Sequence, residues 1–172
     1  VSVKSVLTRF YLFRGLSLAW LYVPYQWFYL RDQGLSATDL MILNTVFCVA
    51  AVILEVPTGA LADRLGRRAV LVTGSLVSSL SCLIFLGMSD SFFWLSLANV
   101  LAALAMTCVS GADSAYLFEL LRHHGRGDGY KRAEAFSSGF KLALGAAGGV
   151  GATVLVAGGF ELSTLYLVTA FL

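Results

Sequence analysis

The chain has 172 residues, of which 58% are hydrophobic and 13% are charged, and its formal net charge is +2. Soluble domains are about 45–50% apolar and about 25% charged, because water has to solvate their surface. The composition therefore excludes a soluble domain and predicts a lipid bilayer, not nucleic acid, as the main partner.

Six stretches along the chain are long and apolar enough to be membrane spans, since a bilayer core requires roughly 20 mostly apolar residues per helix. We expect an all-α membrane protein that forms one transmembrane bundle over residues 1–172, with the sixth helix cut short. The predicted spans are residues 10–30, 40–56, 69–88, 92–112, 136–158 and 162–172.

The basic residues are distributed asymmetrically between the connections. Only Arg31 lies in the connections after the first, third and fifth spans. Lys and Arg are enriched in cytoplasmic loops, so we predict a cytoplasmic N-terminus, with the second and fourth connections on the same side. The nine basic residues assigned to that side are Lys4, Arg9, Arg64, Arg67, Arg68, Arg122, Arg126, Lys131 and Arg132.

The first predicted span carries a cluster of aromatic residues and one cation within its apolar sequence. The aromatic residues form either an interfacial belt or the wall of a cavity that stacks on ligands, and Tyr25 is our candidate cavity residue among them. Arg14 lies about one turn inside the span. It either extends toward the headgroups or is a cavity cation that pairs with Asp113 or an anionic substrate. The aromatic residues are Trp20, Tyr22, Tyr25, Trp27 and Tyr29.

The connection after the second span has the sequence GALADRLGRR, residues 59–68. The glycine at 66 permits a left-handed turn between two helices, and the glycine at 59 permits another helix to approach closely. The arginines can anchor the connection at anionic headgroups or pair with carboxylates. On residue chemistry alone, the connection is either a topology anchor or a charged functional motif.

This connection matches the G-x-L-x-D-R-x-G-R-[RK] pattern at every position and resembles the signature of the major facilitator superfamily. The resemblance implies that the chain is the N-terminal half of a twelve-helix transporter, with the missing C-terminal half as its partner. It also implies a cytoplasmic latch that holds the outward-open state, with Asp63 as the latch carboxylate and Gly59 as the close-contact residue. The predicted latch residues are Gly59, Asp63, Arg64, Gly66, Arg67 and Arg68.

Further features of the second, fourth and fifth spans refine this picture. Glu55 and Asp113 place an acid at the cytoplasmic end of the second and fourth spans, as in one bacterial branch of the family, and we expect them to be charged partners there. Asn99 either forms a hydrogen bond between helices or lines a cavity, and it occupies the position at which drug/proton antiporters of the family carry an arginine. Lys141 in the glycine-rich fifth span is either buried in the bundle or extends to the interface.

The resulting functional prediction is a secondary transporter that moves a small solute by alternating access, with drug or metabolite efflux as the nearest class. The alternative is a non-transporting receptor or interaction protein with the same fold. The sequence shows no paired-acid, His-acid or Cys-His constellation, so we expect no enzyme activity, no metal site and no cofactor; coupling to a proton or ion gradient stays open. The bacterial inner membrane is the expected location.

Overall fold

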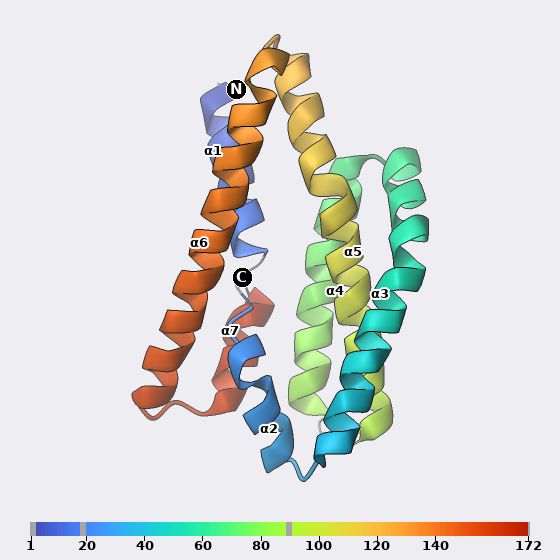
Figure 1. The fold of residues 1–172 in the computed structure, drawn as a ribbon, viewed down its shortest axis with the longest axis vertical. Helices are drawn as coiled ribbons and strands as arrows, with labels where there is room; N and C mark the ends of the chain where they lie inside the picture. Colours follow the sequence, from blue (N-terminus) through green and yellow to red (C-terminus); the bar gives the residue numbers. More distant parts are fainter. Residues whose placement is uncertain (1–2, 18–19, 89–90, 172) are drawn as a thin grey trace.

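The computed structural model describes residues 3–17, 20–88 and 91–171, which are helical almost throughout and contain no strand (Figure 1). The helices, with the two short 3-10 helices labelled η, are α1 Val3–Leu16, η1 Val23–Tyr25, α2 Gln26–Asp32, α3 Ala37–Leu65, α4 Arg67–Gly87, α5 Phe92–His123, η2 Gly127–Gly129, α6 Tyr130–Ala157 and α7 Leu162–Phe171. The expected all-α fold is confirmed.

The long helices begin and end where local chemistry dictates. At the start of α3, the Ser36 hydroxyl accepts a hydrogen bond from the Asp39 backbone N–H, and the Asp39 carboxylate accepts one from the Ser36 N–H. This capping box satisfies two backbone donors that a helix start leaves unpaired. Gly66 separates α3 from α4 with φ of 88°, a conformation that favours glycine.

By length and composition, four helices in the described part of the chain can cross a membrane: α3, α4, α5 and the stretch Gly127–Ala157 that contains α6. α7 is a shorter apolar helix. The apolar faces of α3 and α6 stay uncovered, because Val52, Ile53 and Val56 on α3 and Val150 and Val154 on α6 are exposed. Such faces require lipid or another apolar surface as their neighbour.

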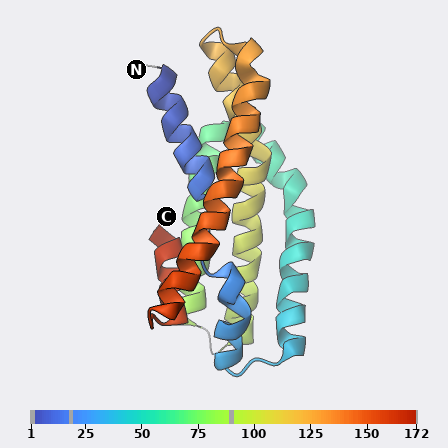
Figure 2. The same ribbon diagram turned by 60° about the vertical axis from the view of Figure 1, so that its left-hand side comes forward.

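The helices run roughly parallel to the long axis of the molecule (Figures 1 and 2). α5 packs against both α3 and α4, while α1 packs against α6 and α7 packs against α4. The N-terminus, the α3–α4 turn and the α5–α6 connection lie toward one end of the bundle, and the α2–α3 and α6–α7 connections lie toward the other (Figure 1). The two strongly basic connections therefore face the same end.

The first predicted span, residues 10–30, is not one continuous helix, which corrects our expectation. α1 ends at Leu16, Ser17 and residues 20–22 are not helical, and the chain is helical at η1 and α2; residues 18 and 19 lie outside the described part. Pro24 contributes to this interruption because it has no N–H to donate and its ring would clash with the carbonyl of Trp20 in a continuous helix. Of the aromatic residues after the break, Tyr22 therefore stacks on Tyr166 of α7, whereas the Tyr25 hydroxyl bonds to Thr153 of α6.

Candidate functional site

The most extensively hydrogen-bonded side chain of the described residues is that of Arg14, which is 4% exposed. Its Nε donates to Asp113 Oδ2 at 2.8 Å, and its Nη1 and Nη2 donate to the two Glu134 carboxylate oxygens at 2.9 and 2.6 Å. Nη1 also donates to the Ser137 hydroxyl and Nη2 to the Ser114 hydroxyl. The planar guanidinium thus binds the Glu134 carboxylate through both Nη atoms and the Asp113 carboxylate through Nε.

This charge cluster, defined as Arg14, Asp113, Glu134 and Lys141, joins α1 to α5 and α6. Lys141 Nζ lies 3.7 Å from Asp113 Oδ2. Two cations therefore face two carboxylates, and this neutrality is what makes burial of the charges tolerable. The extension of Arg14 to the headgroups, one of the two alternatives, is wrong for this structure, and the pairing with Asp113 is present.

The α3–α4 turn holds a second, more exposed ionic group. Arg67 Nε lies 3.0 Å from Glu119 Oε1 on α5, and Arg67 Nη2 lies 3.5 Å from Asp63 Oδ1. The Asp63 side chain is 73% exposed and that of Glu119 is 58% exposed, so water screens both contacts. The turn is thereby tethered to α5 by a weak and reversible interaction.

The other residues of the turn motif point outward. Arg64 and Arg68 are exposed. A methyl group at Gly59 would have no described neighbour within 4 Å, so the close approach expected there is not made within this part of the chain. Glu55 is exposed on α3 and has no ion pair among the described residues, whereas Asp113 belongs to the charge cluster. The predicted acids therefore do not form one group, since Asp63 lies at the turn, Asp113 lies in the charge cluster and Glu55 belongs to neither among the described residues.

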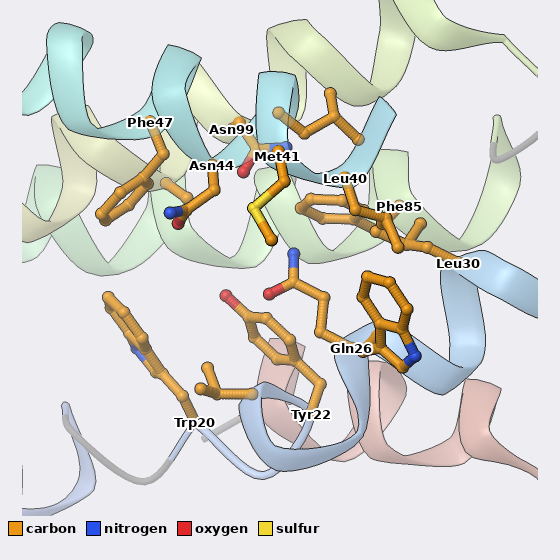
Figure 3. Close-up of a pocket in the computed structure, with 14 residues that line it drawn as sticks. Trp20, Tyr22, Gln26, Leu30, Leu40, Met41, Asn44, Phe47, Phe85 and Asn99 are labelled. Atoms are coloured by element: carbon orange, nitrogen blue, oxygen red, sulfur yellow. The ribbon is translucent and has the colours of Figure 1, made fainter. Parts of the chain in front are cut away.

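A cavity of about 420 Å³ lies between the interrupted first span, α3 and α5 (Figure 3). Trp20, Tyr22 and Gln26 extend from the interrupted segment toward Met41 and Asn44 on α3 (Figure 3). None of the described residues that line this aromatic cavity is charged. The wall is completed by Val23, Trp27, Leu30, Leu40, Leu43, Phe47, Phe85, Asn99 and Ala102.

The candidate cavity residues occupy different places around this aromatic cavity. Asn99 is 5% exposed, lines the cavity, and donates from its amide to the Leu95 carbonyl at 2.9 Å. Tyr25 does not line the cavity; its hydroxyl donates to the Thr153 hydroxyl on α6 at 3.1 Å. Tyr22 lies inside it instead and stacks on Tyr166 with the ring centroids 4.5 Å apart.

Sequence reasoning missed Glu134 and Glu119, the carboxylates that bind Arg14 and Arg67. α5 continues to His123, beyond the predicted end of the span at residue 112, and α6 begins at Tyr130, before the predicted start at 136. Both acids lie in these extensions, which the predicted spans leave in a polar connection. The one available signal was helical spacing, because Glu134, Ser137 and Lys141 recur at intervals of three and four residues and so share one helix face.

These features define an integral membrane protein, an apolar helical bundle with a buried charge cluster and a basic turn between its second and third long segments. Residues 10–172 match the Major Facilitator Superfamily, a family of membrane transporters, and the chain belongs to it. The recognition made from residues 59–68 is therefore confirmed.

Two curated relatives are bacterial resistance proteins. The chain is 27% identical over 140 residues to the quinolone resistance protein NorA of Staphylococcus aureus strain Mu50. It is 30% identical over 142 residues to multidrug resistance protein 2 of Bacillus subtilis strain 168. Each alignment covers 81% of this chain but 35% and 34% of the relative, respectively, so the chain spans about a third of their length. No solved structure matches the chain significantly.

Proposed function

We propose that the chain is the N-terminal six-helix half of a secondary transporter that exports small apolar, aromatic solutes by alternating access. Family membership supports the transport class, and the names of the relatives support export of drug-like compounds. The single observation that carries the solute class is the aromatic cavity beside the interrupted first span. Transporters of several folds place their substrate sites at such discontinuous helices.

The chemistry of the aromatic cavity suggests what it binds. Its described lining consists of aromatic and aliphatic side chains with the amides of Gln26, Asn44 and Asn99 and the hydroxyl of Tyr22. Ligand sites of this kind bury apolar groups and use a few polar atoms to fix orientation. We therefore assign to it the uncharged aromatic part of a solute, with the C-terminal half closing the site from the opposite side.

The proposed cycle assigns the α3–α4 turn to the cytoplasmic face of a bacterial inner membrane. Asp63 would latch the turn to the C-terminal half in the outward-open state, and its exposure in this half leaves it available for that contact. The energy would come from a proton or ion gradient, with no cofactor and no enzymatic step.

The test is transport by the full-length protein in proteoliposomes, with the neutral fluorophore N-phenyl-1-naphthylamine as the solute. We expect gradient-dependent movement that Asn44→Leu weakens several-fold, because this change removes a polar atom from the aromatic cavity. Thr45→Val is the matched control, since the Thr45 hydroxyl is exposed and donates to the Met41 carbonyl of its own helix. Absence of movement in well-folded wild-type protein would contradict the transport proposal and favour a receptor.

A further inference from the structure

A second, smaller cavity of about 160 Å³ lies among α1, α4, α5, α6 and α7, and Trp20 lines both cavities. Among the described residues around the small cavity, Lys141 alone carries a charge, and Ser78 and Ser110 contribute hydroxyl groups to the wall. Phe13 and Met106 provide apolar contacts. Trp20 is thus shared by the wall of the uncharged aromatic cavity and the wall of the cavity that contains Lys141.

The ammonium group of Lys141 has hydrogen-bonding capacity to spare. Its described ionic contact is Asp113 Oδ2 at 3.7 Å, which is longer than a hydrogen bond. That oxygen already accepts from Arg14 Nε at 2.8 Å, and Asp113 Oδ1 accepts from the Ser114 backbone N–H at 2.6 Å. A lysine carries three donors, so Lys141 can bind an additional acceptor without taking one from Arg14.

The small cavity also presents positive rather than negative charge to a ligand. The Asp113 side chain is 4% exposed, whereas that of Lys141 is 25% exposed. A carboxylate is compact enough for a cavity of this size, and its oxygens match the donors of an ammonium group and the neighbouring hydroxyls. A larger or multiply charged anion would not fit beside the buried carboxylate.

We propose that Lys141 binds the carboxylate of aromatic monocarboxylate solutes whose ring system lies in the aromatic cavity against Trp20. The inference rests on the proposed function and extends its solute class from neutral aromatic compounds to aromatic compounds that carry one carboxylate. Arg14 acts here as a positioning residue, because it holds Asp113 and so fixes where Lys141 lies.

The experiment compares two probes of the same shape, radiolabelled 2-naphthoate and its neutral amide 2-naphthamide, on the full-length protein in zwitterionic-lipid vesicles. We expect the wild type to bind the carboxylate about tenfold more tightly than the amide, the range of one charge-assisted hydrogen bond. Lys141→Met should abolish this preference and leave amide binding unchanged, while Lys141→Arg should retain part of it. Lys131→Met on the same helix is the matched control, because Lys131 is exposed outside the cavity.

The outcomes separate this inference from the proposed function. Equal binding of the two probes by the wild type, or an unchanged preference in Lys141→Met, would overturn the carboxylate site and leave the transporter proposal intact. Failure to bind either probe would remove support for both. Loss of naphthoate binding on addition of anionic phospholipid would assign Lys141 to a lipid headgroup and also overturn the inference. Detergent melting temperatures of the variants should stay within a few degrees of the wild type, since Asp113 keeps Arg14 as its partner.

Discussion

Arg14 and Arg67 show how one residue type performs two different tasks in the same bundle. Arg14 is buried and all its donor nitrogens are bound, so its removal would leave two carboxylates without their main partner. Arg67 is tethered to exposed acids that water also solvates. The buried contacts of Arg14 are suited to stabilising the core. The exposed contacts of Arg67 break more easily and are suited to a conformational change.

We expect Arg14→Met to destabilise the full-length protein by about 3–5 kcal/mol, because it removes the main partner of the buried Asp113 and of the partly buried Glu134. Arg14→Lys should be intermediate, since an ammonium cannot form the forked contact to Glu134 while also reaching Asp113. Thermal unfolding in detergent measures the effect. The control Arg9→Met, at an exposed position of the same helix, should change the melting temperature by little. Equal effects at the two positions would contradict the role of the charge cluster.

For Asp63→Asn we expect a much larger loss of transport than of stability. The exposed contact to Arg67 contributes about 1 kcal/mol or less to folding. The transport cycle depends on the balance between two conformations, and a change of about 1.4 kcal/mol in that balance alters the populations roughly tenfold. Transport rate, membrane expression and melting temperature should be measured together. Normal transport by well-folded Asp63→Asn protein would leave the motif as a topology anchor.

At the scale of elements, the contact between α4 and α5 depends on a glycine. A methyl group at Gly74 would lie 3.0 Å from the Cys108 Cβ and 3.2 Å from the Ala105 carbonyl oxygen, so neither neighbour can simply rotate away. We expect Gly74→Val to cost about 1–3 kcal/mol through overpacking. Gly87→Val on the same helix is the control, because a methyl group there has no described neighbour within 4 Å. Similar melting temperatures for the two variants would contradict this packing.

The helices differ in how well hydrophobic patterning predicted them. Long apolar runs such as residues 92–112 were predicted correctly as helical, because their composition alone requires a helix in lipid, but the polar continuation of this helix to His123 was not. Patterning did not predict the interruption after Leu16, since the residues on both sides of the break are equally apolar. It also did not assign Glu134 to Arg14, because that pairing depends on tertiary contacts between residues 120 positions apart.

At the scale of the whole molecule, the arrangement of the connections gives a topology prediction. Both strongly basic connections lie toward one end of the bundle (Figure 1), and we expect that end to be cytoplasmic. In a variant with Cys48, Cys82 and Cys108 replaced by alanine, an impermeant thiol reagent added outside should label Glu161→Cys but not Gly127→Cys. Labelling of Gly127→Cys in intact cells would reverse the assignment.

The charge cluster also has a consequence for how the protein is made. Arg14 leaves the ribosome 99 residues before Asp113 and 120 residues before Glu134, which at about 5–20 residues per second is a delay of roughly 5 to 25 s. During translation its charge has no partner, so the nascent first helix must stay near the headgroups or in the insertion machinery. The first helix can take its buried position only after α5 and α6 have been made, so its ionic contacts form late although it is synthesised first.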